Sequence, residues 1–377
     1  MGGSNCLPLF EVSVSAFNDL PFPKSLGSDN HSGVHPKILQ GILDANRGHA
    51  HSYGMDPISD LAKQEFERIF QKEPFVFYVF NGTAANVLAL GSFLKSYESA
   101  LCSDQAHLNL DECGAPEVLA RTKLTPLPSY DGKIRPEDAE KLFERQGDQH
   151  HVQLKKVSLT QPTELGTVYS MKELRTWKDF CKKRGLYLHC DGARLANALK
   201  SKGHQLSDYA QIFDVISFGG TKNGLLGAEA VVLFDSERAK DLKFIRKQFL
   251  NLPSKTRFLA AQFYTYLQND LYLEMAEKVL DQAQYLKSKL QEFPEVKIHF
   301  PVESNAVFAS FPKHYVKELK KSHFFYIWDS QKSMARLMIS FDWTTNDTDQ
   351  FIQCLQELKN KDGLLQSQPS NTNEASK

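Results

Sequence analysis

Hydrophobic positions along the chain alternate between short runs of β-branched and aromatic residues and longer segments with helical spacing. Short apolar runs of this kind predict buried strands, and apolar residues three and four positions apart predict helices. In the first two thirds of the chain the pattern predicts strands at 75–80, 99–103, 152–159, 186–190, 215–218 and 230–234, and helices at 84–97, 171–184 and from 194 onward. Strands and helices in turn are typical of the α/β class, in which crossover helices connect a parallel sheet.

The pattern changes after Phe249. A long helical region at 254–293 is followed by helices that alternate with strand-like segments at 296–300, 306–311 and 336–341. We therefore predict a large domain at 25–250 with a mostly parallel sheet, and a smaller C-terminal α+β domain at 251–365. Residues 1–24 form an N-terminal extension of unassigned role, and residues 366–377 have no apolar anchor and are predicted to be a disordered tail.

Composition narrows the class of protein. The chain has 45 Lys+Arg and 45 Asp+Glu residues, so its net charge is zero, which argues against a nucleic-acid partner. Hydrophobic residues make up 41% of the sequence, enough to fill a large core, but no apolar run approaches the roughly 20 residues that span a bilayer. We predict a soluble protein without a nucleic-acid or membrane partner.

The six cysteines are scattered without a CxxC pair, and a chain of 377 residues does not need disulfides to fold. The N-terminus lacks the pattern of a signal peptide. Both observations favour a reducing, cytoplasmic location. No HExxH motif occurs either, so we expect no metal site.

An aspartate and a lysine follow two neighbouring strands of the predicted sheet. Asp191 lies in the segment HCDGAR and Lys222 in the segment SFGGTKNG. Ligands of such sheets bind at the carboxyl ends of the strands. Most lysines are solvated, and an aspartate after a strand is often a helix cap. A lysine surrounded by glycines after an apolar strand, however, does not belong to an ordinary solvated surface.

Pyridoxal 5'-phosphate catalysis requires this pair of residues. A lysine amine forms a Schiff base with the cofactor aldehyde, and partial burial lowers the pKa of the lysine so that it can act as a nucleophile. A carboxylate pairs with the pyridinium nitrogen and makes the ring an electron sink for a carbanion at the substrate Cα. Lys222 and Asp191 are therefore candidate catalytic and cofactor-binding residues.

Such a cofactor also needs a phosphate site. The segment FNGTAAN at 80–86 joins a predicted strand to a predicted helix, and its Gly82 and Thr83 lie at the helix start. Backbone N–H groups and a hydroxyl at a helix N-terminus bind anions. A threonine there is also a common helix cap, so this segment indicates a phosphate site only together with Asp191 and Lys222.

The run from Ser28 to Arg336 resembles the threonine aldolases of the aromatic-amino-acid β-eliminating lyase group, which are pyridoxal-phosphate enzymes of fold type I. The most specific matching segments are DGAR and SFGGTKNG. The full set of matching segments is 28–30, 53–57, 81–83, 106–107, 191–194 and 217–224. The resemblance implies a fold type I architecture, pyridoxal 5'-phosphate as cofactor and a homodimer or homotetramer.

The resemblance also assigns roles to individual residues. His107 matches a histidine that stacks on the cofactor ring, and an imidazole could equally accept the substrate hydroxyl proton. Arg194 and Arg336 match the pair of arginines that binds the substrate carboxylate, one from each domain. Ser28 matches a contact to that carboxyl group. Tyr53 matches a residue beside the cofactor, reached from a second subunit.

Two further cofactor contacts are implied. Thr221 precedes the lysine in the matching segment. Arg257 lies in the segment SKTR at 254–257, where the family supplies a phosphate contact, often across a dimer interface. This segment departs from the glycine-rich version of many relatives, so a surface charge on a helix is an equal interpretation of Arg257.

We therefore expect a lyase that cleaves L-threonine or L-allo-threonine by retro-aldol reaction to glycine and an aldehyde, with Lys222, Asp191 and His107 as catalytic residues. One alternative is β-elimination on another amino acid, because the same electron sink serves several reactions at Cα. The other alternative is a non-catalytic amino-acid-binding relative. Against it stands the joint presence of Lys222, Asp191, Arg194 and Arg336, which a scaffold would not need.

Overall fold

The computed structural model describes residues 20–366. Most of the predicted extension at 1–24 and nearly all of the predicted tail at 366–377 lie outside this range. Gln366 itself is the last residue of helix α14 (Thr345–Gln366). Within the described residues, no helix combines the length and the apolar character that crossing a membrane requires.

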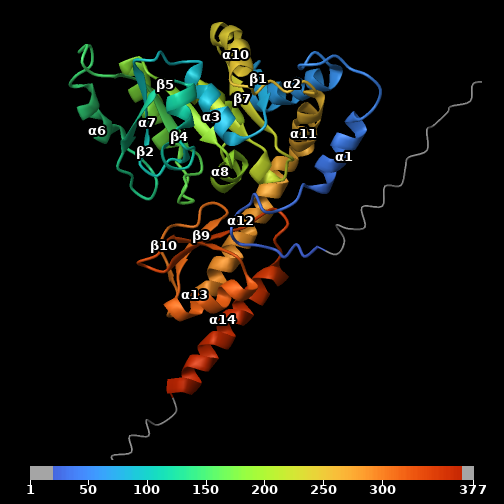
Figure 1. Cartoon of the computed structure of the whole chain (residues 1–377), viewed down its shortest axis with the longest axis vertical. Helices are drawn as coiled ribbons and strands as arrows, with labels where there is room; N and C mark the ends of the chain where they lie inside the picture. Colours follow the sequence, from blue (N-terminus) through green and yellow to red (C-terminus); the bar gives the residue numbers. More distant parts are fainter. Residues whose placement is uncertain (1–19, 367–377) are drawn as a thin grey trace, which may run out of the picture.

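A seven-stranded sheet forms the centre of the large domain (Figure 1). Its strands lie in the order β1-β7-β6-β5-β4-β2-β3; β7 is antiparallel to both of its neighbours and all other pairings are parallel. The strands are β1 (Phe75–Val79), β2 (Glu98–Ser103), β3 (Lys123–Leu127), β4 (Gln153–Thr160), β5 (Tyr187–Gly192), β6 (Val215–Gly219) and β7 (Glu229–Leu233). The predicted fold class is confirmed, although β3 was not predicted.

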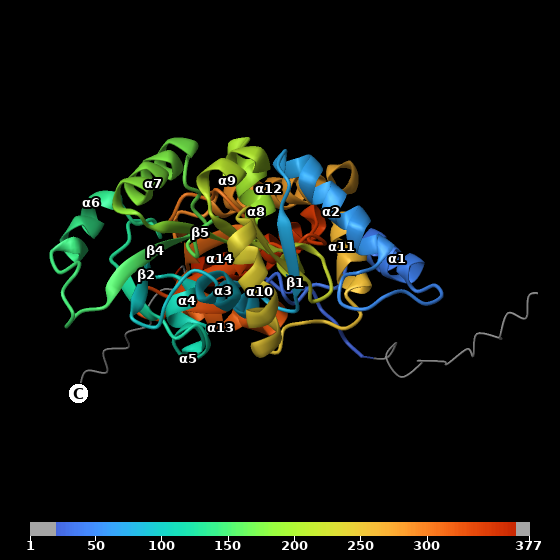
Figure 2. The same cartoon turned by 90° about the horizontal axis from the view of Figure 1, so that it is seen from above.

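Helices cover both faces of this sheet (Figure 2). Strand β6 shows why, because Val215 packs into the core under α3 and α10, whereas Ile216 and Phe218 pack into the core on the other face. Burial on both faces is the reason that parallel strands are almost continuously apolar. The covering helices are α3 (Gly82–Gly91) and α10 (Ser236–Gln248) on one face, and α7 (Met171–Arg184), α8 (Leu195–Lys202) and α9 (Leu206–Ile212) on the other.

Local sequence fixes the bounds of α7. The Ser170 side chain accepts a hydrogen bond from the Glu173 backbone N–H, and the Glu173 side chain accepts from the Ser170 backbone N–H, which is a capping box. The helix ends at Gly185, whose φ of 65° suits glycine. The predicted bounds 171–184 are therefore confirmed.

Three helices pack together at the β1 side of the large domain, namely α1 (Pro36–Ala45), α2 (Pro57–Phe70) and α11 (Arg257–Leu267). The short helices of the large domain are α4 (His107–Leu110), α5 (Ala115–Leu119), α6 (Pro136–Ala139) and the 3₁₀ turns η2 (Glu140–Phe143), η3 (Thr221–Asn223) and η4 (Gln268–Asp270).

The small domain contains an antiparallel four-stranded sheet in the order β10-β11-β9-β8. It lies below the large sheet in Figure 1, with helices α13 and α14 beside it. Its elements are α12 (Leu271–Leu290), β8 (Lys297–Ile298), β9 (Ala306–Ser310), α13 (Lys313–Ser322), β10 (Tyr326–Asp329), β11 (Met334–Met338) and α14. The predicted α+β character of this region is confirmed.

Helix α12 contributes buried residues to the cores of both domains. Its residues up to Ala276 belong to the core of the large domain, and from Val279 onward its buried residues belong to the core of the small domain. The helical region expected at 254–293 is confirmed as two helices, because Asn269 and Asp270 have φ values of 52° and 55° and separate α11 from α12. The division of domains at 250/251 stays a prediction, since the core around the large sheet takes in residues on both sides of it.

The N-terminal segment of the described chain also joins the two domains. Leu26 is buried in the small-domain core. Its backbone N–H donates to Phe324 O at 2.9 Å, and its carbonyl accepts from Met338 N at 2.8 Å. The next residues run to the large domain, where His35 N donates to Gly224 O at 2.9 Å. Residues 27–31 therefore cross from one domain to the other.

Candidate active site

A cavity of about 510 Å³ lies at the carboxyl ends of β4, β5 and β6, next to the loop that follows β2. Tyr326, Trp328 and Arg336 of the small domain contribute to its wall. The structure brings seven of the predicted site residues together here, namely Ser28, Gly82, His107, Asp191, Arg194, Lys222 and Arg336. Thr83, Thr221, Tyr53 and Arg257 do not line it.

A close backbone approach brings the ends of β5 and β6 together. Asp191 lies opposite Ser217 in the parallel register of these strands. A Cβ on Gly219 would stand 2.2–2.6 Å from backbone atoms of Ala193, so only glycine fits there. The loops that carry Arg194 and Lys222 therefore start side by side.

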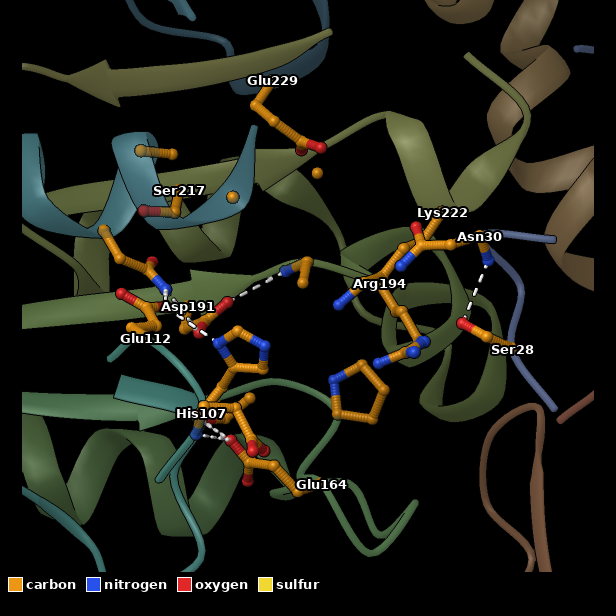
Figure 3. A pocket seen from close by; sticks show the side chains of 18 of the residues that line it. Ser28, Asn30, His107, Glu112, Glu164, Asp191, Arg194, Ser217, Lys222 and Glu229 are labelled. Atoms are coloured by element: carbon orange, nitrogen blue, oxygen red, sulfur yellow. Dashed lines mark hydrogen bonds and ion pairs between the residues drawn. The ribbon is translucent and has the colours of Figure 1, made fainter. Parts of the chain in front are cut away.

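Lys222 lies in η3 at the end of β6 and faces the cavity beside Arg194 (Figure 3). The positive charge of Arg194 and burial both lower the pKa of the Lys222 amine. A larger fraction of the amine is therefore unprotonated near neutral pH, which a nucleophilic lysine requires.

Asp191 is 3% exposed, and both of its carboxylate oxygens accept hydrogen bonds. Oδ2 accepts from Asn86 Nδ2 at 2.9 Å, and Oδ1 accepts from the Ala193 backbone N–H at 3.2 Å. The same Asn86 amide also donates to Glu112 Oε1 at 2.8 Å. Asn86 was missed by sequence reasoning, although it is the last residue of the FNGTAAN segment.

His107 starts α4 and lies across the cavity from Lys222 (Figure 3). Its Nδ1 is 3.0 Å from Glu112 Oε1, and this hydrogen bond raises the pKa of His107 against the opposing effect of burial. The other ring nitrogen, Nε2, remains for a ligand. Glu112 follows five residues after His107, but nothing in the sequence pattern identified it as a partner.

Glu164 lies beneath His107 and was also missed (Figure 3). Its Oε1 accepts from the His107 backbone N–H and from Thr160 Oγ1, each at 2.9 Å. Its Oε2 is shielded from solvent and has no hydrogen-bond partner among residues 20–366. Burial and the charge of Asp191 raise the pKa of Glu164 to about 7.

The two predicted carboxylate-binding arginines differ in their partners. Arg194 forms an ion pair with Asp29, a residue of the N-terminal crossing segment. Arg336 donates from Nη2 to Gly27 O at 3.3 Å, and its guanidinium lies 5.3 Å from the centre of the Trp328 ring. Ser28 lies between Gly27 and Asp29 in the chain, and its Oγ accepts a hydrogen bond from Asn30 N at 3.1 Å.

Thr83 does not cap helix α3, although threonine is a common helix cap. Asn81 caps the helix, because its side chain accepts from Ala84 N at 2.8 Å. Thr83 is therefore the second residue of the helix and not its cap. Thr221, next to the lysine, has a buried hydroxyl without a hydrogen-bond partner in the described part of the chain.

Tyr53 and Arg257 lie close together away from the cavity. Tyr53 N donates to Ser254 O at 3.0 Å, and Arg257 Nη1 donates to Arg47 O at 3.2 Å. The Tyr53 side chain is 47% exposed. These two assignments stay predictions.

No group of three His, Cys, Asp or Glu side chains within the described range is arranged to hold a metal ion. The cavity instead combines an amine, two guanidinium groups, two imidazoles and several carboxyl groups. A mostly parallel α/β sheet with a lysine and an aspartate at neighbouring strand ends, closed by a smaller domain, defines a class of protein that binds a small anionic molecule beside a reactive amine.

The model of the beta-eliminating lyase family matches residues 25–313, and the chain belongs to this family. It is similar to the low specificity L-threonine aldolase of Pseudomonas aeruginosa, with 38% identity over 323 residues that cover 85% of this chain and 93% of the relative. It is also similar to the low specificity L-threonine aldolase of Saccharomyces cerevisiae, with 29% identity over 78% of this chain and 74% of the relative.

Among solved structures, the chain is similar to a threonine aldolase of Leishmania major. The TM-score is 0.86 at 28% sequence identity, and the match covers 89% of this chain and 99% of the other. Such a match over both domains confirms the predicted architecture and the family resemblance.

Proposed function

We propose that this protein is a pyridoxal-phosphate-dependent lyase that cleaves L-threonine or L-allo-threonine to glycine and acetaldehyde. The observation that carries the proposal is the meeting of Lys222, Asp191 and His107 with two arginines in one cavity. The similarity to L-threonine aldolases over most of the chain supports the choice of substrate and reaction.

The residues present fit the cofactor. Lys222 would hold it covalently, Asp191 would pair with the ring nitrogen and His107 would stack on the ring. For the phosphate, the start of α3 offers free N–H groups, and the space where a Cβ of Gly82 would stand is open. Thr221 does not line the cavity, and its role as a cofactor contact stays a prediction.

When bound, pyridoxal phosphate supplies an electron sink for the bond that breaks at the substrate Cα. The chain itself must hold the amino acid in one orientation. Arg194 and Arg336 would do this by binding the carboxylate from two sides, and Ser28 lies at the same wall. A fixed orientation selects which bond at Cα breaks.

The β-hydroxyl proton must leave as the Cα–Cβ bond breaks. Two groups in the cavity can hold a proton near neutral pH, namely His107 through Nε2 and Glu164 through Oε2. Oε1 of Glu164 already accepts two hydrogen bonds, so a proton on this carboxyl group belongs on Oε2. The pH profiles of His107→Gln and Glu164→Gln would identify which group takes the proton, because the profile of the responsible variant loses one ionisation.

The test measures products. Purified protein with threonine and allo-threonine should yield acetaldehyde and glycine in equal amounts, and Lys222→Ala should yield neither. β-Elimination is the second candidate because the family is named for it. Serine that yields pyruvate at a higher kcat/KM than threonine cleavage would favour that reaction. Binding of amino acids without any turnover would favour the non-catalytic alternative.

We also propose that the chain forms a homodimer or homotetramer through the face made by α1 and α2. Leu43 on α1 and Met55, just before α2, are 63% and 69% exposed, and exposed large apolar side chains favour association. Tyr53 lies beside Met55, so a second copy on this face would meet it. Leu43→Glu should dissociate the assembly in light scattering, whereas Phe244→Glu, on α10, should not.

A cytoplasmic location is likewise part of the proposal. Cys102, Cys113, Cys181, Cys190 and Cys354 are free thiols in the structure. Free thiols are typical of a reducing compartment. Fractionation of cells that express the protein would test this.

A further inference from the structure

Asp29, which lies behind the cavity wall, forms a buried ion pair with the cavity residue Arg194. Its carboxylate is 1% exposed. Oδ2 accepts from Arg194 Nε at 2.5 Å, and Oδ1 accepts from Arg194 Nη2 at 2.8 Å. This side-on, bidentate arrangement fixes the plane of the guanidinium and leaves its Nη1 end free.

A third hydrogen bond comes from the small domain. Asn305 Nδ2 donates to Asp29 Oδ2 at 3.0 Å and also to Ile339 O at 2.9 Å. Asp29 belongs to the segment whose Leu26 pairs with the small-domain strand β11. The orientation of Arg194, a large-domain residue, is therefore set by groups that are anchored to the small domain.

The ion pair also balances the negative charge of Asp29 against the positive charge of Arg194. Burial alone would raise the pKa of Asp29, but the charge and hydrogen bonds of Arg194 outweigh burial and lower it. Asp29 is therefore ionised at neutral pH, and it compensates the charge of Arg194. A compensated guanidinium still donates hydrogen bonds, but it attracts an anion less strongly than a free one.

Arg336 differs from Arg194 in the groups that surround its guanidinium. Its side chain forms no ion pair with a carboxylate in the described part of the chain, and its Nε is buried without a partner. Its neighbours are the rings of Trp328 at 5.3 Å and Tyr326 at 5.9 Å. Within residues 20–366, its positive charge is balanced from a distance, by Asp29 and Asp111, and by no carboxylate in direct contact.

We propose that Asp29 is the positioning residue of the carboxylate site: it holds Arg194 in one orientation and cancels its charge, so that Arg194 supplies direction and Arg336 supplies charge to the binding of the substrate carboxylate. This inference rests on the proposed function, because it assumes that an amino acid is the ligand. The sequence predicts that Arg194 and Arg336 both bind the substrate carboxylate, and the proposal gives each arginine a different role in that binding.

The test compares glycine with glycinamide, which lacks the carboxylate charge. The ratio of their dissociation constants, measured by absorbance titration of the holoenzyme, isolates the contribution of that charge. Arg336→Gln should reduce the preference for glycine at least thirtyfold, whereas the double variant Asp29→Asn/Arg194→Gln, which removes the compensated pair without leaving a buried charge, should reduce it less than fivefold. The reverse order would overturn the division of roles.

Asp29→Asn keeps the shape of the side chain and removes its charge. It should leave the preference for glycine at least as large as in the wild type, while kcat for threonine falls at least tenfold because Arg194 is no longer fixed. Asp148→Asn is the matched control, since Asp148 pairs with Arg145 at 2.5 Å on the surface outside the cavity. The proposal fails if Asp29→Asn behaves like this control.

Asn305→Ala provides a second route in case Asp29→Asn does not fold. It removes one hydrogen bond from Asp29 but leaves the ion pair, so kcat should fall about threefold with an unchanged glycine preference. An unchanged kcat would contradict the positioning role. If the wild type itself does not cleave threonine, the proposed function fails, while the titration with glycine and glycinamide still tests the division between the arginines.

Discussion

The cavity has two walls that are built in different ways. The wall from the large domain is cross-linked by hydrogen bonds, since the Asn86 amide donates to both Asp191 and Glu112, and Glu112 accepts from His107. Asp191 stands at a strand end, Asn86 and His107 lie on helices, and Glu112 lies in the turn between α4 and α5. Their positions are therefore set before any ligand binds.

The wall from the small domain has few hydrogen bonds. Arg336 makes one, to Gly27 O, and is otherwise held between the rings of Tyr326 and Trp328. Its Nε has no partner in the described part of the chain. The comparison indicates that the large-domain wall is prepared for a cofactor that stays, whereas the small-domain wall leaves donors free for a substrate that comes and goes.

Lys222→Ala should have the largest effect, because it removes the only predicted covalent attachment. We expect the protein to lose its visible absorbance band and threonine cleavage to fall at least about a thousandfold. Lys202→Ala is the control, since Lys202 pairs with Glu303 outside the cavity. Borohydride reduction and peptide mapping that label another lysine would contradict the assignment.

Asp191→Asn tests whether the cross-linked wall acts through charge. The amide keeps one oxygen for hydrogen bonds but no longer stabilises a proton on the cofactor ring, so kcat should fall by about two to three orders of magnitude while the visible band persists. Asp214→Asn changes a carboxylate near the opposite end of the same strands, where it accepts from Leu188 N, and should leave kcat unchanged. Unchanged turnover in Asp191→Asn would refute the role of its charge.

The sequence predicted the main site residues of the large-domain wall, but it did not predict the hydrogen bonds that connect them. Asp191, Lys222 and His107 could be found because strand periodicity places them at strand ends, and strand ends of a parallel sheet meet. Asn86 and Glu112 could not, because a hydrogen bond between a helix and a distant turn depends on side-chain positions that no local pattern encodes. Glu164 escaped for the same reason, as its pKa depends on burial and on the charge of Asp191, which is distant from it in the sequence.

The helices and strands, too, could be predicted only where the local sequence pattern is strong. The apolar strands of the large sheet were predicted nearly to the residue, since burial on both faces leaves a strong signal. The break between α11 and α12 was not predicted, because Asn269 and Asp270 adopt left-handed conformations that tertiary packing imposes on an otherwise helical pattern. Strand β3, with a proline at Pro126, carries too few apolar residues to stand out at the sheet edge.

Glu164→Gln tests how strained the carboxyl groups of the large-domain wall are. Burial raises the pKa of Glu164 to about 7, whereas the ordinary value for a glutamate is 4.5. Stability from the bound proton is fully present below pH 4.5 and is lost as the pH rises through 7. Since one pKa unit corresponds to about 1.4 kcal/mol, the loss is about 3 kcal/mol by pH 8.

Glutamine resembles the protonated acid and does not titrate, so Glu164→Gln should gain stability relative to the wild type as the pH rises. Urea unfolding at pH 5.5 and pH 8 measures the difference between the two proteins. Glu303→Gln, which changes a glutamate outside the cavity, should show no such divergence. Parallel pH curves for wild type and Glu164→Gln would show that Glu164 is ionised throughout.

Trp328→Leu should have the smallest effect and tests the other wall. The indole lies 5.3 Å from the Arg336 guanidinium, and such a contact contributes about 1 kcal/mol. Without it Arg336 becomes more mobile, so KM for threonine should rise about fivefold while kcat changes less than twofold. Tyr130→Leu removes a matched contact, with Arg135 at 4.1 Å and outside the cavity, and should change neither constant. A fall in kcat with an unchanged KM would mean that the small-domain wall takes part in the chemistry, and the division between a fixed cofactor wall and an adaptable substrate wall would then be wrong.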